Sequence, residues 1–249
     1  MVSPVTLAAL YGKGIFTTIA INKSEPFLWE KHWRRLADNT EKLGIDLSEH
    51  SEETTRSAVV EIITRNAVIN GRARLTFLDQ SSGNIWPTNR IGKTSLLVIT
   101  GDVPAVSESV RLTISPYSVN SRSPLAGVKS CNYLEKILAL DEAKTRSFDE
   151  AIQVNERGHI VSAVMANVFW LRDELLCTPS LKTGCLPGTT REFLMESLVC
   201  REVEADLDEL NSADAIFLTS AGLGVVRVGE FELRRFKNID HPILKLLPK

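Results

Sequence analysis

The fold is decided by a stretch that brings a lysine up to the start of a helix, Gly127-Val128-Lys129-Ser130-Cys131-Asn132-Tyr133-Leu134-Glu135-Lys136. Residues 121–127 contain serine, proline and glycine and predict a loop. Apolar residues recur at helical spacing over 133–146 and predict a helix. Most lysines are solvated surface charges, and a lysine becomes a nucleophile only where its surroundings lower its pKa or an aldehyde cofactor captures it. Because Lys129 lies in the segment that approaches the helix, it is the first candidate for a catalytic residue.

The composition is that of an ordinary globular protein. Of the 249 residues, 43% are hydrophobic and 24% are charged, and the formal net charge is -2. This balance gives no general attraction to nucleic acid, and no apolar run is long enough to span a membrane. We therefore expect a small-molecule substrate, with neither nucleic acid nor a membrane as a partner.

The cysteines and the N-terminus bear on the cellular compartment. The four cysteines show no C-x-x-C spacing and no histidine close in sequence. We therefore expect reduced thiols and no metal site. Residues 1–5 lack the basic region and apolar run of a secretory signal. These observations favour a cytoplasmic protein.

Strands and helices alternate along the chain, which predicts an α/β fold with mixed sheets. The expected strands are residues 15–21, 73–78, 95–100, 110–119, 150–155, 168–171, 175–178 and 215–219. The expected helices are residues 29–43, 51–68 and 133–146, and one that follows Arg191 and runs through Cys200. Residues 101–107 contain proline and small side chains and suit a linker. We expect two domains, residues 1–103 and residues 104–249, with Lys129 in the second.

Two turns have the chemistry of a phosphate site. Gly188-Thr189-Thr190 stands at a helix start, where free backbone N–H groups and the helix dipole favour an anion. The alternative is that one threonine merely caps the helix. Ser220-Ala221-Gly222 follows a strand, and its small residues let backbone amides approach a ligand. Together with Lys129 and Arg35, these turns supply what pyridoxal phosphate requires, an amine for the aldehyde and an arginine with amide donors for the phosphate.

The sequence resembles the fold-type IV pyridoxal phosphate enzymes, also called class IV aminotransferases, over nearly the whole chain. The resemblance rests on five motifs in the family's order: Tyr11-Gly12-Lys13-Gly14-Ile15-Phe16, His32-Trp33-Arg34-Arg35-Leu36, Lys129 with Asn132 and Leu134, Ala166-Asn167-Val168-Phe169-Trp170, and Leu186-Pro187-Gly188-Thr189-Thr190-Arg191. It implies a two-domain fold like that of D-amino acid aminotransferase, pyridoxal 5′-phosphate as the cofactor, and a homodimer.

The resemblance also implies roles for individual residues. Lys129 matches the lysine that bonds covalently to the cofactor, and Arg35 matches the arginine that binds its phosphate. The remaining implied cofactor-binding residues are Ser162, Asn167, Thr189, Thr190, Ser220 and Ala221. Thr17 is a second catalytic candidate, as a residue that helps to protonate the departing group.

One departure from the family bears on the reaction. Ser162 stands where the family has a glutamate that faces the pyridine nitrogen and keeps it protonated. A neutral hydroxyl makes the ring a weaker electron sink, and transamination should suffer more than elimination. Phe16-Thr17-Thr18 and the segment 166–170 are most similar to the aminodeoxychorismate lyases of the family.

We therefore expect a lyase that cleaves 4-amino-4-deoxychorismate to 4-aminobenzoate and pyruvate, a step in folate biosynthesis. One alternative is a class IV aminotransferase that acts on a small branched-chain or D-amino acid through the same lysine. Another is a family member that has lost catalysis, with Ser162 as the sign of that loss. Four arginines are candidates to bind a substrate carboxylate: Arg72, Arg74, Arg90 and Arg227.

Overall fold

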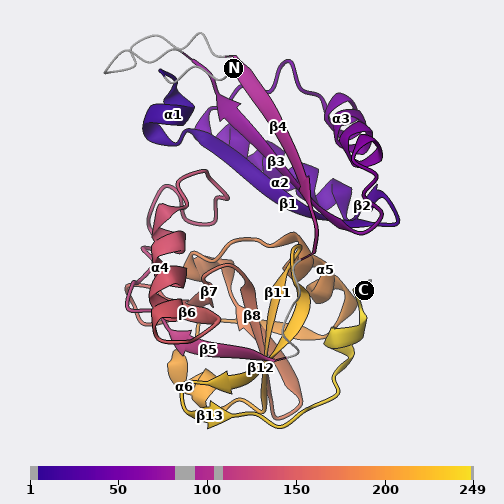
Figure 1. Cartoon of the computed structure of the whole chain (residues 1–249). Coiled ribbons are helices and arrows are strands. Elements are labelled where there is room, and N and C mark those ends of the chain that lie inside the picture. Colours follow the sequence, from indigo (N-terminus) through magenta and orange to yellow (C-terminus); the bar gives the residue numbers. More distant parts are fainter. Residues whose placement is uncertain (1–4, 82–92, 104–108, 248–249) are drawn as a thin grey trace. The chain divides into compact units, whose positions relative to one another are not determined.

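The structure is a computed structural model that describes residues 5–81, 93–103 and 109–247 (Figure 1). It has the mixed α/β fold that the sequence predicts. The chain forms two compact units, residues 1–104 with 128–133, and residues 105–127 with 134–249. The expected domain boundary between residues 103 and 104 borders a segment outside the described residues. No helix in the described part of the chain is long and apolar enough to cross a membrane.

The lysine segment groups with the first unit, which differs from the expectation that it belongs to the second domain. The amide of Phe16 donates to the carbonyl of Lys129 at 2.9 Å, and the amide of Cys131 donates to the carbonyl of Gly14 at 2.8 Å. Ser130 pairs with Ile15 in an antiparallel bridge. These are contacts between residues more than 100 positions apart, which sequence order alone does not reveal.

The first unit is an antiparallel sheet in the order β2-β1-β3-β4. Its strands are β1 (Gly14–Asn22), β2 (Glu25–Pro26), β3 (Gly71–Asp79) and β4 (Thr94–Gly101), and its helices are α1 (Leu7–Tyr11), α2 (Trp29–Leu43) and α3 (Glu52–Arg65). Alternate apolar residues of β1 and β3, among them Ile15, Ile19 and Leu75, form one core with residues of α2 and α3. Helices α2 and α3 therefore lie on one face of this sheet (Figure 1). Helix α1 is an element that the sequence analysis did not anticipate.

The second unit contains a nine-stranded mixed sheet in the order β10-β9-β8-β11-β12-β5-β6-β7, with β13 paired to β12. The strands are β5 (Val110–Ile114), β6 (Glu150–Val154), β7 (Ile160–Ala163), β8 (Asn167–Arg172), β9 (Leu175–Pro179), β10 (Cys200–Val203), β11 (Ala215–Ser220), β12 (Gly224–Phe231) and β13 (Arg234–Arg235). The helices are α4 (Leu134–Thr145), α5 (Thr189–Ser197) and α6 (Leu207–Ser212), with short 3-10 turns η1 (Leu181–Thr183) and η2 (Pro242–Lys245). Helix α4 covers β6, because Ala139 and Ala143 pack against Ala151 and Val164.

Two elements of this unit are shorter than the sequence predicts. Strand β5 ends at Ile114, and beyond it Val119 forms only an isolated bridge. Pro116 follows soon after the end of β5 and has no N–H to continue a ladder. Helix α5 ends at Ser197, because Cys200 begins β10 and pairs in parallel with β9.

Candidate active site

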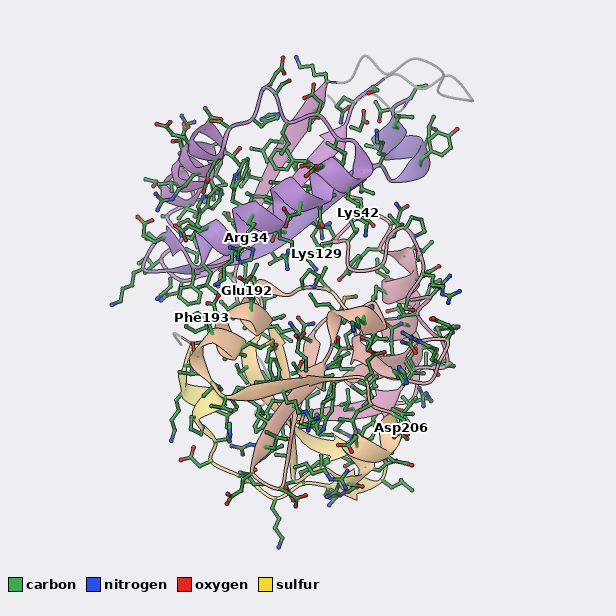
Figure 2. All side chains as sticks on the ribbon, turned by 180° about the vertical axis from the view of Figure 1, so that it is seen from behind. Arg34, Lys42, Lys129, Glu192, Phe193 and Asp206 are labelled. Atoms are coloured by element: carbon green, nitrogen blue, oxygen red, sulfur yellow. The ribbon has the colours of Figure 1, made fainter. Side chains whose placement is uncertain are left out.

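Lys129 is held against the first strand of the first unit (Figure 2). Its Nζ donates a hydrogen bond to Oη of Tyr133 at 3.2 Å. The same Nζ lies 4.5 Å from the centroid of the Phe16 ring, and Phe16 packs edge-to-face on Tyr133 with centroids 5.0 Å apart. Two aromatic rings and a hydroxyl therefore fix the position of this amine.

Two of the four candidate arginines share a sheet face with Phe16. Arg74 lies opposite Thr18 and Arg72 opposite Ala20, so their side chains leave the sheet on the same side as Phe16. The guanidinium carbon of Arg74 lies 3.7 Å from the Phe16 ring centroid. Arg74 and Lys129 thus both contact the ring of Phe16.

Arg72 carries an unsatisfied guanidinium. Its Nε and Nη2 are buried and have no hydrogen-bond partner among the described residues, and burial lowers the pKa of Arg72. An unpaired buried donor is costly, which favours a carboxylate ligand for this group. Arg227 lies in the second unit and bonds Asn238 at 2.6 Å, whereas Arg90 is outside the described residues.

Thr17, His32 and Arg35 form a buried chain on the helix-covered face of this sheet. Oγ1 of Thr17 accepts from Nη2 of Arg35 at 2.7 Å and lies 2.7 Å from Nδ1 of His32. Arg35 is 8% exposed, His32 1% and Thr17 0%. Burial, and then the charges of Arg35 and Lys129, hold the pKa of His32 well below its ordinary value. His32 is therefore neutral at physiological pH.

We infer from the chemistry of its partners that the Thr17 hydroxyl donates to His32. A guanidinium can only donate, so Thr17 accepts from Arg35. No other acceptor for the hydroxyl hydrogen is found among the described residues, and a neutral Nδ1 can accept it. In this arrangement Thr17 contacts Arg35 directly, and its expected role of protonating a leaving group stays a prediction.

A candidate anion site of the second unit lies around the start of α5. Gly188 caps the helix, and a Cβ at this position would collide with Oδ1 of Asn167. Nδ2 of Asn167 donates to the carbonyl of Leu186 at 2.9 Å, which fixes the turn before the helix. Thr189 and Thr190 are both buried in the first turn of α5. Asn167 thus fixes the backbone that leads into the first turn of α5.

Strand β11 adds an unsatisfied hydroxyl to this anion site. Thr219 pairs with Asn167 across β11 and β8, so the two side chains project from the same face. Oγ1 of Thr219 is buried and has no hydrogen-bond partner among the described residues. The next residue, Ser220, opens a turn in which its Oγ accepts from the amide of Leu223 at 3.1 Å, and Ala221 lies in that turn. A phosphate fits this set of donors at a helix start.

Ser162 is buried, and its strand partner contacts a lysine. It pairs with Gln153 across β7 and β6, and Nζ of Lys136 donates a short hydrogen bond to Oε1 of Gln153. Burial lowers the pKa of Lys136 to about 8. The neighbouring Glu150 carboxylate accepts from the amides of Ala151, Val164 and Met165 at 2.8 to 3.1 Å, and burial raises the pKa of Glu150 to about 7.

The structure thus gathers the expected residues in four groups, two in each unit. The first unit joins Lys129 to Phe16, and joins Thr17 to Arg35. The second unit joins Asn167 to the α5 turn, and places Ser162 next to Gln153. Five further residues of these groups were not predicted from the sequence to have a functional role: His32, Lys136, Glu150, Gln153 and Thr219. Lys136 had a signal, because it falls on the helical stripe of the buried Ala139 and Ala143.

Known families and proteins are similar to this chain over most of its length. The sequence matches the family described as Amino-transferase class IV over residues 14–231. It is 27% identical to a putative branched-chain-amino-acid aminotransferase of Methanocaldococcus jannaschii, over 92% of this chain and 82% of that protein. It is 26% identical to the aminodeoxychorismate lyase of Bacillus subtilis, over 93% of this chain and 82% of that protein.

A solved structure of a related protein has the same fold. A putative 4-amino-4-deoxychorismate lyase of Legionella pneumophila superposes with a TM-score of 0.88 at 26% identity, covering 98% of this chain and 92% of that one. The likeness confirms the predicted fold-type IV architecture. The family match spans most of the sequence, and the predicted cofactor is that of the family. The chain therefore belongs to the class IV aminotransferases, a family of pyridoxal phosphate-dependent enzymes.

Proposed function

We propose that this protein is a pyridoxal phosphate-dependent lyase that cleaves 4-amino-4-deoxychorismate to 4-aminobenzoate and pyruvate. The observation that carries the proposal is the setting of Ser162, which pairs with Gln153, whose side chain accepts a hydrogen bond from the Lys136 amine. We assign Ser162 to the ring nitrogen of the cofactor. A ring that is not held protonated is a weak electron sink, and this favours elimination over transamination.

The proposal includes the cofactor-binding residues. We assign Lys129 to the covalent bond with the aldehyde. We assign phosphate binding to Arg35, to Thr189 and Thr190 of the α5 turn, and to Ser220 and Ala221. Asn167 holds the α5 turn, and the unpaired Oγ1 of Thr219 is one further donor. When bound, the cofactor supplies an aldehyde that condenses with amines and a ring that withdraws electrons.

Lys129 carries the proton in the proposed reaction. Once the substrate amine has replaced it, its free Nζ accepts the proton from the amine-bearing carbon of the substrate. The enolpyruvyl group then leaves from the neighbouring carbon, and the same proton completes pyruvate, so no water is consumed. Tyr133 accepts a hydrogen bond from Nζ at 3.2 Å and holds the amine in place during this transfer.

The arginines beside Phe16 suit a substrate with two carboxylates. Arg74 contacts the same ring as Lys129, and Arg72 has buried donors without partners. A guanidinium binds a carboxylate with two parallel hydrogen bonds, which orients as well as attracts it. We assign both residues to substrate carboxylates.

The cellular setting belongs to the same proposal. A lyase of this specificity acts in folate biosynthesis, and we propose a cytoplasmic homodimer. Light scattering on the purified protein measures the assembly, and a monomer mass would contradict the homodimer.

The test compares two products of one enzyme preparation. Purified protein saturated with pyridoxal phosphate is given 4-amino-4-deoxychorismate, and pyruvate and 4-aminobenzoate are measured. In parallel, branched-chain and D-amino acids are tested for amino-group transfer to 2-oxoglutarate. Equimolar pyruvate and 4-aminobenzoate with little transfer supports the lyase.

Other outcomes identify the alternatives. Efficient transfer without pyruvate release would make the protein an aminotransferase, the activity named for its relative in M. jannaschii. A protein that takes up no pyridoxal phosphate would be a family member that has lost catalysis.

A further inference from the structure

The second unit contains a buried amine that the proposed reaction does not use. Lys136 lies on α4, and its Nζ donates to Oε1 of Gln153. The charged and titratable groups that face it are Glu150 from β6, Glu135 from its own helix and the thiol of Cys185. The Glu150 carboxylate is already turned to three backbone amides. Among the residues that the structure describes, Lys136 therefore has a neutral hydrogen-bond partner, and no carboxylate is hydrogen-bonded to it.

Gln153 connects this amine to Ser162. Gln153 and Ser162 are direct partners in the antiparallel pair of β6 and β7, so their side chains stand on one face with Cβ atoms about 5 Å apart. Nε2 of Gln153 lies 3.5 Å from the carbonyl of Tyr117, and this second contact keeps the amide oriented toward Lys136. Only the side chain of Gln153 therefore separates the Lys136 amine from a group that contacts Ser162.

We propose that Lys136 is a positioning residue that sets the electrostatic potential at Ser162 and keeps the ring nitrogen of the bound cofactor unprotonated. This inference rests on the proposed function, in which Ser162 faces that nitrogen. The positive charge of Lys136, on the far side of Gln153, disfavours a positive charge on the ring nitrogen. The Ser162 hydroxyl can donate a hydrogen bond to an unprotonated nitrogen. The inference also means that a carboxylate placed at position 162 pairs with Lys136 before it can protonate the ring.

The first experiment observes the ring nitrogen directly. The full chain is loaded with pyridoxal phosphate that carries ¹⁵N in the ring, and the ¹⁵N shift is recorded from pH 6 to 9. The wild type and Lys144→Met, a control at an exposed lysine of the same helix, should show an unprotonated nitrogen throughout. Lys136→Met should raise the pKa of the nitrogen by about one unit or more. Lys136→Arg, which keeps the charge, should restore the wild-type shift.

The second experiment is a double-substitution cycle on the same signal. Ser162→Glu alone should leave the nitrogen largely unprotonated, whereas Ser162→Glu with Lys136→Met should protonate it. If Lys136→Met does not fold, Lys136→Gln removes the charge and keeps a polar contact with Gln153. A protonated nitrogen in the wild type, or equal shifts with and without Lys136, would overturn the inference.

A third measurement needs no cofactor and separates this inference from the proposed function. In the cofactor-free full chain, Ser162→Glu should lower the melting temperature less when Lys136 is present than in the Lys136→Met background. This coupling is expected even if the protein binds no pyridoxal phosphate. If the two substitutions change the melting temperature additively, Lys136 does not interact with residue 162. That result would overturn the inference, even in a protein that binds the cofactor.

Discussion

Oγ1 of Thr17 lies 2.7 Å from Nδ1 of His32, within hydrogen-bond distance. Because Thr17 also accepts from Arg35 at 2.7 Å, a neutral Nδ1 that accepts the hydroxyl hydrogen satisfies the Thr17 hydroxyl as both donor and acceptor. The neutral imidazole of His32 accepts from the Thr17 hydroxyl, and the same hydroxyl oxygen accepts from the Arg35 guanidinium. A buried hydrogen-bonded chain of this kind holds a cation in position more firmly than a solvated contact does.

Replacing Thr17 with valine should weaken cofactor binding. The loss of a buried hydrogen bond to a charged group costs about 1.5–3 kcal/mol, which corresponds to a roughly 10- to 100-fold rise in the dissociation constant of pyridoxal phosphate. Thr17→Ser keeps the hydroxyl and should bind like the wild type, and Arg35→Ala should lose at least as much affinity as Thr17→Val. A fluorescence titration measures all three. If Thr17→Val retains cofactor affinity and loses only turnover, Thr17 acts on the substrate and not on Arg35.

Acid should destabilise the protein through His32. Its pKa in the folded state is lowered, so the unfolded chain binds a proton more readily below the ordinary value of 6.5. The free energy of unfolding should therefore fall as the pH drops below about 6.5, by up to about 1.4 kcal/mol per pH unit from this residue. His32→Asn supplies a neutral acceptor for Thr17 and should show a flatter profile in urea unfolding. Parallel profiles for the two proteins would show that His32 is not held neutral by the fold.

Glu150 should act on stability in the opposite direction. Its pKa in the folded state is raised to about 7, so the native chain keeps a proton that the unfolded chain releases above 4.5. The corresponding stabilisation, about 3 kcal/mol, is present below pH 4.5 and is lost as the pH rises to about 7. Glu150→Gln should remove this pH dependence, whereas Glu49→Gln at an exposed position should not. An unchanged slope in Glu150→Gln between pH 4.5 and 7 would contradict the raised pKa.

Removing Arg74 should impair substrate binding and leave the cofactor in place. Arg74→Met keeps the apolar stem over Phe16 and loses the charge near Lys129, so KM for 4-amino-4-deoxychorismate should rise roughly 10- to 100-fold. Arg65→Met, on the exposed side of α3, is the matched control. Steady-state kinetics with saturating cofactor measure both variants. A fall in cofactor affinity with KM unchanged would move Arg74 from the substrate to the cofactor.

Much of the fold was predictable because its signals are local. Glycine at 44 ends α2 with a left-handed residue, and Ser51 caps α3 through its hydroxyl, as the sequence indicates. The grouping of Lys129 with β1 was not predictable, since it depends on hydrogen bonds to residues 14 and 16, far away in the sequence. The Thr219 hydroxyl has no hydrogen-bond partner among the described residues, and its place beside Asn167 depends on the pairing of β11 with β8. Sequence periodicity does not reveal which residues of two strands are paired.

The site residues were predictable where they belong to contiguous motifs. Arg35 and Gly188 stand in such motifs, and the structure gives each a defined environment. The neighbours of Ser162 were not predictable in the same way. Gln153 reaches Ser162 through strand pairing and Lys136 reaches Gln153 through helix packing, so both contacts require the tertiary structure.

The central claim is that Lys129 is the amine that bonds to the cofactor, and the chain offers a direct rival. Lys136 follows seven positions later and has a pKa lowered to about 8, which also suits an amine for covalent chemistry. Purified protein loaded with pyridoxal phosphate is reduced with borohydride, digested, and the modified peptide is located by mass spectrometry. The account predicts one pyridoxyl group per chain on Lys129, with none in Lys129→Ala and wild-type labelling in Lys136→Met. A pyridoxyl group on Lys136, or undiminished labelling of Lys129→Ala, would contradict it.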